Sequence, residues 1–328
     1  MIGIVIPFFQ RTPGLLNRAL LSIAAQEGAQ QFHVYVVDDS SPVSVESELA
    51  GLGEDFTRNV TILRQPNGGP GAARNLALDS IAADTTFIAF LDSDDVWTSN
   101  HLDNVAAAFA AGADFYFAEH QREEDAQSRF VQCAFRPGGE PVAGGDGTIF
   151  CSDARTLSRA IMMRSPVGTS TVAIRRDKIG KTRFATWLRS AGEDSIFWLE
   201  LLRTSIKVAC GVTLEGVLGR GVSVFNHRGW GDVATLRTVL DEMRTQIYLR
   251  ENFALDRRLA AQSQMRCGAL DQTFCLNLLS CIRRGNWPPP GLVFAYLRQR
   301  PLAPLRLPAA ATHAIGHKLA ILISALTW

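Results

Sequence analysis

The first hundred residues alternate between short apolar runs and segments with helical spacing, and this alternation limits the fold more than any other feature. Residues 2–9, IGIVIPFF, are almost wholly apolar, which is typical of a strand buried on both faces of a parallel sheet. Similar patterns predict three more strands and two helices between them: strands at 33–37, 60–63 and 86–91, and helices at 15–24 and 71–81. The alternation predicts a doubly wound α/β unit.

Polar side chains follow three of these predicted strands at the point where each ends. Arg11 comes after the first strand, Asp38 and Asp39 after the second, and residues 92–95, with three aspartates, after the fourth. Open parallel sheets bind ligands just outside the carboxyl ends of their strands. We therefore expect the binding site at this edge of the sheet.

Overall composition excludes some classes of partner. The 328 residues include 33 Lys and Arg against 32 Asp and Glu, so no charge excess favours binding to nucleic acid. The six cysteines form no C-x-x-C pair, which favours a reducing compartment. The first apolar run has no basic region before it and no cleavage site after it, so we expect a cytoplasmic protein.

Beyond residue 112 the alternation loosens, and we expect the acceptor side to be built from residues 112–192. Residues 137–148 are rich in Gly and Pro, as loops often are. The remaining predicted elements are strands at 114–119 and 171–174 and helical segments at 193–202 and 232–282.

The C-terminal residues carry charge of one sign. Residues 275–328 contain six basic and no acidic side chains, together with Trp287, Tyr296 and Trp328. This combination fits a peripheral contact with anionic lipid, although an ordinary helical cap on the domain explains the apolar spacing equally well. The longest apolar run near the end, LAILISAL, is far shorter than the roughly 20 residues that a spanning helix needs.

The strongest single motif is FLDSDDVW, residues 90–97, in which a predicted strand ends in three carboxylates. Asp92, Asp94 and Asp95 repel one another unless a positive charge lies among them. A hard divalent cation such as Mg²⁺ or Mn²⁺ would relieve the repulsion and bridge to phosphate oxygens. The alternative is a solvated acidic turn before the next helix, because so short a motif specifies function loosely.

Two further motifs belong to the same edge. VVDDSS, residues 36–41, places Asp39 where it could accept hydrogen bonds from a base or ribose, or cap a turn. NGGPGAARN, residues 67–75, sets three glycines before a helix whose first turn exposes N–H groups to an anion, with Arg74 one turn in. A tight turn and a surface charge are the alternative interpretations.

Five segments in order resemble the family 2 glycosyltransferases of the GT-A fold: IVIPFFQR, VVDDSS, NGGPGAARN, FLDSDDVW and GEDSIFW. GVSVFNHRGWG and QRTPGLL look most like bacterial exopolysaccharide glucosyltransferases of the succinoglycan type. The resemblance implies an α/β GT-A domain over residues 1–235, with one Rossmann-like mixed sheet flanked by helices. Its nucleotide-binding half would be 1–97 and its acceptor half 98–235, followed by a helical C-terminal extension over 236–328.

The resemblance also implies the parts of the site. Pro7, Phe8 and Arg11 flank the nucleotide, Asp39 binds its base, and Asp94 is the direct ligand of Mn²⁺ or Mg²⁺. The residues assigned to nucleotide-sugar binding are Pro7, Phe8, Arg11, Asp39, Gly69, Arg74, Asp92, Ser93 and Arg228. Those assigned to the metal are Asp92, Asp94 and His227, although a single histidine in a glycine-containing loop is otherwise an exposed residue.

Transfer to a hydroxyl needs a carboxylate that takes the proton as the hydroxyl attacks the sugar carbon. The resemblance assigns this role to Asp194, with Glu193 as the alternate. Two carboxylates at the start of an apolar helix would otherwise only complement the helix dipole. The family implies inversion at the sugar carbon, a UDP-sugar donor with glucose as the sugar, and a saccharide acceptor linked to lipid at the cytoplasmic face of the inner membrane.

Two other functions fit parts of the sequence. A nucleotidyltransferase also uses an α/β sheet, a carboxylate pair and a divalent cation, but would carry a basic, glycine-rich signature where this chain has PFFQ after its first strand. A non-catalytic scaffold that binds nucleotide sugars would keep the fold and lose the chemistry, against which the intact carboxylates count. The apolar helices after Asp232 could pair subunits into a homo-oligomer.

Overall fold

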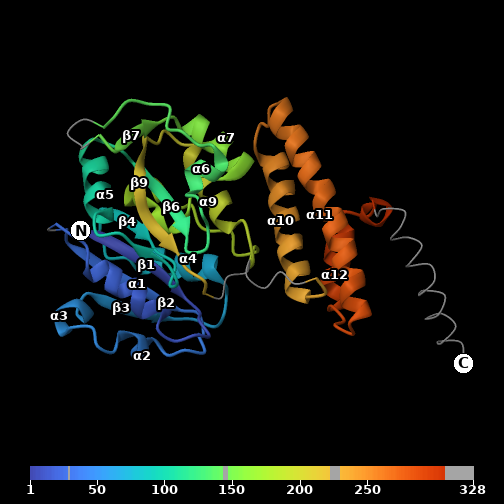
Figure 1. Cartoon of the computed structure of the whole chain (residues 1–328), viewed down its shortest axis with the longest axis horizontal. Coiled ribbons are helices and arrows are strands. Elements are labelled where there is room, and N and C mark those ends of the chain that lie inside the picture. Colours follow the sequence, from blue (N-terminus) through green and yellow to red (C-terminus); the bar gives the residue numbers. More distant parts are fainter. Residues whose placement is uncertain (29, 143–146, 222–229, 307–328) are drawn as a thin grey trace, which may run out of the picture. The chain divides into compact units, whose positions relative to one another are not determined.

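The computed structural model describes residues 1–28, 30–142, 147–221 and 230–306 (Figure 1). The chain divides into two compact units. The first contains Met1–Arg189 and Glu193–Val222, and the second contains Ser190–Gly192 and Ser223–Trp328. All strands belong to the first unit in the described part of the chain, and the second is helical.

A nine-stranded sheet forms the centre of the first unit, and its first half is parallel. The parallel strands, in spatial order, are β3 (Val60–Arg64), β2 (Phe32–Asp38), β1 (Ile2–Phe8) and β4 (Phe87–Phe90). Central β1 sets Ile4 opposite Val34 of β2 on one side and Ala89 of β4 on the other. The four strands predicted from apolar runs are confirmed.

The second half of the sheet is mixed. Antiparallel β8 (Ala173–Arg175) separates β4 from β6 (Phe115–Arg122), and β9 (Val208–Leu218) then runs parallel to β6. Two short strands, β5 (Val96–Trp97) and β7 (Ile149–Ser152), pair with β9 in the antiparallel sense. One mixed sheet flanked by helices confirms the predicted fold class.

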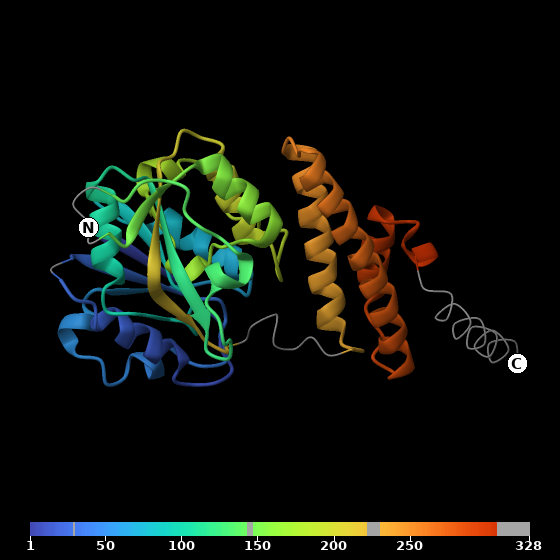
Figure 2. The same ribbon diagram turned by 45° about the horizontal axis from the view of Figure 1, so that its top comes forward.

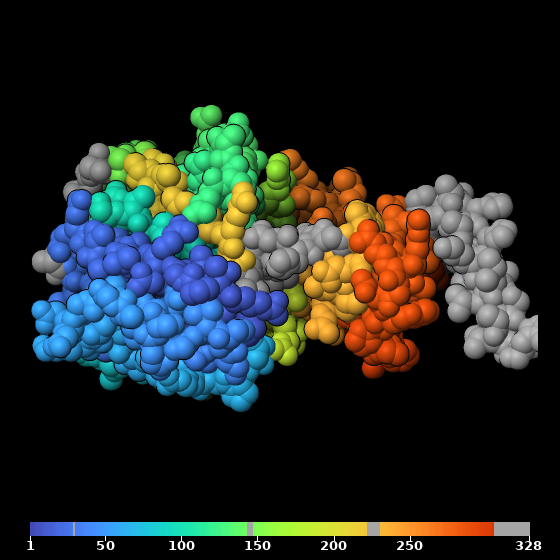
Figure 3. All heavy atoms as spheres, turned by 60° about the horizontal axis from the view of Figure 1, so that its bottom comes forward, coloured from blue at the N-terminus to red at the C-terminus, as the bar shows by residue number. Residues whose placement is uncertain are grey.

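Helices cover both faces of the sheet (Figure 2). The longer ones are α1 (Leu15–Ala24), α4 (Pro70–Ser80), α5 (His101–Ala110), α7 (Ala154–Arg164) and α9 (Glu193–Leu202). The short ones are α2 (Val45–Leu49), α3 (Glu54–Thr57), α6 (Arg129–Cys133), α8 (Arg176–Ile179) and the 3₁₀ turn η1 (Thr169–Thr171). Figure 3 views the first unit from the side of its N-terminal segments, shown in blue.

The two faces of the sheet have different cores because neighbouring strand residues point to opposite sides. Leu20 of α1 and Val105 of α5 belong to an aliphatic core with Ile4 of β1. An aromatic core lies around Phe90, whose ring meets that of Trp198 of α9 edge to face, with centroids 5.5 Å apart. This second core lies behind the residues that form the candidate site.

Three helices form the second unit: α10 (Val233–Asn252), α11 (Arg257–Arg283) and α12 (Pro290–Gln299), followed by the 3₁₀ turn η2 (Ala303–Arg306). Asp256 interrupts the helical segment predicted over 232–282, since its carboxylate accepts a hydrogen bond from the Leu259 amide and caps α11. Among the described residues, no helix combines the length and apolar character needed to cross a bilayer.

An ion pair with a buried carboxylate fixes α12 against α11. Asp271 is fully buried and accepts hydrogen bonds from the Tyr296 hydroxyl at 3.1 Å and from Arg300 Nη2 at 2.6 Å. The Tyr296 ring stacks on Phe274 with 3.7 Å between centroids. Tyr296 is therefore a core residue, which corrects the expectation that it faces a membrane, and Trp328 lies outside the described residues.

Candidate active site

The three carboxylates after β4 separate into two kinds. Asp95 is buried, and its oxygens accept hydrogen bonds from the Ser170 hydroxyl and, at 2.9 Å, from the Gly219 amide. Burial, with Asp94 and Asp92 nearby, raises the pKa of Asp95 well above its ordinary value. Asp95 therefore anchors the turn, and Asp92 and Asp94 remain as the pair that can hold a cation.

Asp94 lies against the chain that follows β9. One oxygen accepts a hydrogen bond from the Gly221 amide at 2.7 Å, and burial, followed by the charge of Asp92, raises its pKa. A Cβ at Gly219 would lie 1.9 Å from the Asp94 carbonyl oxygen, so a side chain has no room there. The close approach requires glycine and fixes the position of the Asp94 carboxylate.

Arg74 joins the two carboxylate pairs predicted from the sequence. It projects from α4, is 3% exposed, and donates from Nη2 to Asp92 at 2.6 Å and from Nη1 to Glu193 at 3.0 Å. Its guanidinium also lies 5.3 Å from the centroid of the Phe184 ring. The surface alternative for Arg74 is wrong, because the side chain is buried between carboxylates from two different elements.

Glu193 and Asp194 have different surroundings, although they are adjacent. Glu193 is buried, and burial together with Asp194 raises its pKa to about 7 despite the opposing effect of Arg74. Asp194 is partly exposed and accepts a hydrogen bond from the Thr169 hydroxyl at 3.3 Å. The contacts commit Glu193 to Arg74 and leave Asp194 the more accessible carboxylate.

Asp39 binds the glycine-rich turn before α4. Its oxygens accept hydrogen bonds from the amides of Gly68 at 2.6 Å and Gly69 at 2.8 Å, and from Gln65 at 2.7 Å. Gly69 has a φ of 88°, which favours glycine. The turn and Asp39 therefore hold each other, and Asp39 is buried beneath the turn.

The residues near the end of β1 lie at different depths. Phe8 is fully buried in the aliphatic core, and only its carbonyl reaches the site edge, where it accepts the Asp39 amide at 2.9 Å. Pro7 is half-buried and Arg11 is exposed. Ser93 is buried and accepts a hydrogen bond from Gln10 Nε2 at 3.0 Å. The Phe8 ring thus supports the site from behind and cannot flank a nucleotide.

The sequence patterns missed the 3₁₀ turn η1. Its Thr169 binds Asp194, and its Ser170 hydroxyl binds Asp95 while accepting the Asp92 amide at 3.0 Å. Three consecutive hydroxyl residues after a glycine, GTST, were the available signal. One turn therefore contacts the segments that carry both carboxylate pairs.

His227 and Arg228 lie outside the described residues. In the part of the chain that the structure describes, no three His, Cys, Asp or Glu side chains converge as metal ligands. Asp92 and Asp94 alone fit a Mg²⁺ or Mn²⁺ site of the kind that uses one or two carboxylates and completes its coordination with substrate phosphates and water.

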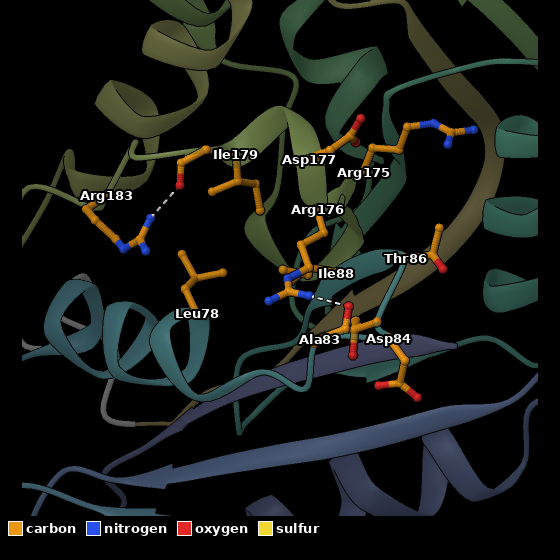
Figure 4. Close-up of a pocket in the computed structure, with 12 residues that line it drawn as sticks. Leu78, Ala83, Asp84, Thr86, Ile88, Arg175, Arg176, Asp177, Ile179 and Arg183 are labelled. Carbon is orange, nitrogen blue, oxygen red and sulfur yellow. Dashed lines mark hydrogen bonds between the residues drawn. The ribbon is translucent and has the colours of Figure 1, made fainter.

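A cavity of about 570 Å³ lies elsewhere on the first unit, beside Thr86 at the start of β4 (Figure 4). No predicted site residue lines it. Arg176 on its wall donates to the carbonyl of Ala83, and Arg183 donates to the carbonyl of Gly180. These guanidinium groups hold backbone in place. The cavity is separate from the candidate site because the two share no residue.

Comparisons with known proteins identify the family of this chain. The model of the family Glycosyl transferase family 2 matches residues 3–163. The succinoglycan biosynthesis protein ExoW of Rhizobium meliloti (strain 1021) is 35% identical over 224 residues, which cover 68% of this chain and 70% of ExoW.

Two solved structures share the fold. S. aureus TarS 1–349 in complex with UDP-GlcNAc has a TM-score of 0.53 and 16% identity, covering 94% of this chain and 93% of that chain. The mannosyltransferase PcManGT from Pyrobaculum calidifontis in complex with GDP-Man and Mn²⁺ has a TM-score of 0.53 and 14% identity, covering 98% and 80%. The resemblance first drawn from five sequence motifs is confirmed: the chain belongs to glycosyltransferase family 2 and is a hexosyltransferase of the GT-A fold.

Proposed function

We propose that this chain transfers glucose from UDP-glucose to a hydroxyl of a lipid-linked saccharide, with inversion, during synthesis of a bacterial exopolysaccharide at the cytoplasmic face of the inner membrane. The observation that carries the proposal is Arg74, which binds Asp92 and Glu193 at once. It thereby brings the donor-side carboxylates next to the carboxylates that can serve the acceptor. The likeness to a succinoglycan biosynthesis protein supports the product class.

The donor would lie along the carboxyl ends of β1, β2 and β4. Asp39 would accept a hydrogen bond from the base, with Pro7, Arg11 and Gly69 around the nucleotide. Arg74, Asp92 and Ser93 lie nearer the sugar and diphosphate, and Arg228 is proposed as a further phosphate contact. Arg74 is suited to this position because its charge is balanced by two carboxylates and its direction is fixed.

Asp92 and Asp94 would hold Mn²⁺ or Mg²⁺, and His227 is proposed as a third ligand. Burial and mutual repulsion disfavour the charged form of Asp94, and a cation between the two carboxylates would reverse that effect. When bound, the cation would stabilise the charge that develops on the leaving diphosphate. PcManGT was solved with Mn²⁺ and GDP-Man, which supports such a site.

Asp194 would act as the base because it is more accessible than Glu193. It takes the proton of the acceptor hydroxyl as that oxygen forms a bond to the anomeric carbon. The bond from this carbon to the phosphate oxygen breaks on the opposite side, and the nucleoside diphosphate leaves with both electrons. A single displacement of this kind converts an α-linked donor into a β-linked product, while Glu193 holds Arg74 in place.

We further propose that residues 1–97 bind the donor and 98–235 the acceptor, with 236–328 as a helical extension. Pairing of subunits through that extension stays a prediction. Family membership removes the nucleotidyltransferase alternative. The paired carboxylates around Arg74 count against a scaffold without catalysis.

Calorimetry with UDP tests the donor site, in the presence of Mn²⁺, Mg²⁺ or a chelator, on the wild type and on Asp94→Ala. We expect binding that needs both the cation and Asp94. Turnover of UDP-glucose compared with UDP-GlcNAc and UDP-galactose then tests the sugar, and the anomeric proton coupling of the product tests inversion. Binding of UDP that ignores the chelator and Asp94→Ala alike would refute the metal site.

A further inference from the structure

The helical unit ends in a group of exposed aromatic and basic side chains, which we call the aromatic tip: Trp230, Arg283, Arg284 and Trp287. Trp230 is 54% exposed and Trp287 is 63% exposed. Both arginines are exposed as well. Burial of large aromatic rings against a partner surface is favourable, and a group of such rings indicates a binding surface where single exposed rings do not.

Hydrogen bonds bring the two tryptophans to the same end of the unit. The start of α10 meets the end of α11 at Gly231, whose amide donates to Asn277 Oδ1 at 2.7 Å. Asn286 Nδ2 donates to the Gly231 carbonyl at 3.0 Å. Since Gly231 adjoins Trp230 and Asn286 adjoins Trp287, the rings project from backbone segments that are directly bonded.

Arg284 belongs to the same contact. A Cβ built on Gly231, which has a φ of 89°, would lie 2.5 Å from Arg284 Cδ, so the stem of this arginine crosses the glycine. The positive φ and the close approach both require glycine at this position. The aromatic tip is therefore a defined arrangement and not a chance exposure of separate residues.

The charged side chains at the aromatic tip are basic, and the one acidic neighbour caps a helix. Residues 272–306 contain no Asp or Glu. The neighbouring Asp232 caps α10 by accepting the Ala234 amide at 2.8 Å. At the other end of the α10–α11 hairpin, Glu251 and Asp256 accompany Arg250, Arg257 and Arg258, and no tryptophan lies beside them. The aromatic tip is therefore the end of the hairpin at which exposed tryptophans and arginines occur together.

The exposed face of α12 continues this chemistry. Phe294 is 68% exposed, and Arg298, four residues later, is exposed on the same side of the helix. An aromatic ring beside a guanidinium suits the interface of a bilayer, where the ring enters the headgroup region and the charge meets lipid phosphate.

We propose that the aromatic tip binds the surface of a bilayer that contains anionic lipid. The tryptophan rings insert at the level of the headgroups, and Arg283 and Arg284 contact the phosphates. The proposal does not depend on the sugar or on the transfer reaction, because it concerns the helical unit alone. It keeps Arg283, Arg284 and Trp287 from the C-terminal residues 275–328 that the sequence pointed to, and it adds Trp230.

Sedimentation of the full-length chain with vesicles tests the charge. Phosphatidylcholine vesicles with phosphatidylglycerol should bind, vesicles without it should not, and salt should weaken binding. Arg283→Gln with Arg284→Gln should reduce the partition coefficient about 30-fold. The matched control, Arg257→Gln with Arg258→Gln, removes the same charge at the other end of the hairpin and should change it far less. Equal losses in the two variants, or no binding by the wild type, would overturn the proposal.

Quenching by brominated lipid tests the rings. Trp230→Phe with Trp287→Phe should remove most of the lipid quenching of tryptophan fluorescence. Trp187→Phe, which removes a tryptophan that is 45% exposed in the first unit, should leave it unchanged. Circular dichroism confirms that each variant is folded. Quenching that survives the double change would show that the tip does not enter the bilayer. If a soluble oligosaccharide competes with the vesicles for the protein, the rings bind a saccharide and the proposal fails.

Discussion

Each unit contains an arginine that binds a buried carboxylate, and the two clusters differ in which of their atoms are left without a partner. In the helical unit, Arg300 donates to both oxygens of Asp271, which is fully buried and also accepts from Tyr296. In the first unit, Arg74 divides its two Nη atoms between carboxylates of different elements. Its Nε has no partner in the described structure, and the Asp92 side chain is 34% exposed.

The difference separates a structural ion pair from a candidate reaction centre made of the same residue types. In the closed cluster both carboxylate oxygens of Asp271 are bound by other protein groups, so removal of the cluster should lower stability. The open cluster leaves the Arg74 Nε without a partner and Asp92 partly exposed, while burial raises the pKa of Glu193 and of the neighbouring Asp94, so its removal should cost activity. Four experiments test this contrast.

The largest effect should come from Asp194→Asn. Loss of the proposed base should lower turnover of UDP-glucose about a thousandfold. The thermal unfolding temperature should stay at the wild-type value, because Thr169 is the side chain that binds this carboxylate in the described structure. Asp177→Asn, at an exposed position of α8, is the control for both measurements. If Asp194→Asn stays active and Glu193→Gln does not, the base is Glu193.

Asp271→Ala should have the opposite pattern. Removing the buried carboxylate leaves Arg300, whose side chain is 20% exposed, and the Tyr296 hydroxyl without their partner, and should lower the free energy of unfolding in urea by about 3 kcal/mol. The affinity of the folded variant for UDP, measured by calorimetry at low temperature, should not change. A variant that loses affinity for UDP while keeping its stability would erase the distinction between the two clusters.

Glu193 should make the metal-free protein less stable as pH rises. Its pKa is about 7 when folded and 4.5 in a model chain, so the folded state binds the proton more tightly. Its contribution to stability is therefore complete below about pH 4.5 and is lost as pH rises through 7, by about 3 kcal/mol at most. Glu193→Gln should flatten this slope in urea unfolding at a series of pH values. An unchanged slope would refute the raised pKa.

The smallest effect should come from Thr169→Val. The substitution keeps the shape and removes the hydroxyl that binds Asp194, so kcat should fall about tenfold with the KM for the donor unchanged. Thr169→Ser keeps the hydroxyl and should restore most of the rate. A fall that Thr169→Ser does not rescue would mean that packing of the threonine methyl group, and not the hydrogen bond, is what matters.

Local sequence patterns predicted the parallel half of the sheet and several of the helices. The four parallel strands and helices α1, α4 and α9 follow from apolar spacing. Strand β9 was not predicted, although it is the longest strand in the described structure. Its pairing with β6 shifts register near Glu119, and it contains Gly211 and Gly216, so its pattern is not regular.

The candidate site divides in the same way. Motif spacing selected Asp92, Asp94, Arg74 and the Glu193–Asp194 pair, which the structure gathers at the predicted edge of the sheet. Spacing could not tell that Asp95 turns inward to Ser170, because that contact joins positions 75 residues apart. Nor could it tell that Phe8 faces the core, since the burial of a strand residue depends on which helices pack against that face of the sheet.

The turn η1 fixes the spacing between two parts of the candidate site. Thr169 binds the proposed base, and the next residue, Ser170, binds the turn that carries the proposed metal ligands. The separation between the proposed base and the proposed metal ligands is thus tied to the rise of a single 3₁₀ step. An acceptor of a different size must then be accommodated by other parts of the wall, and libraries that seek new acceptors should leave residues 169–171 untouched.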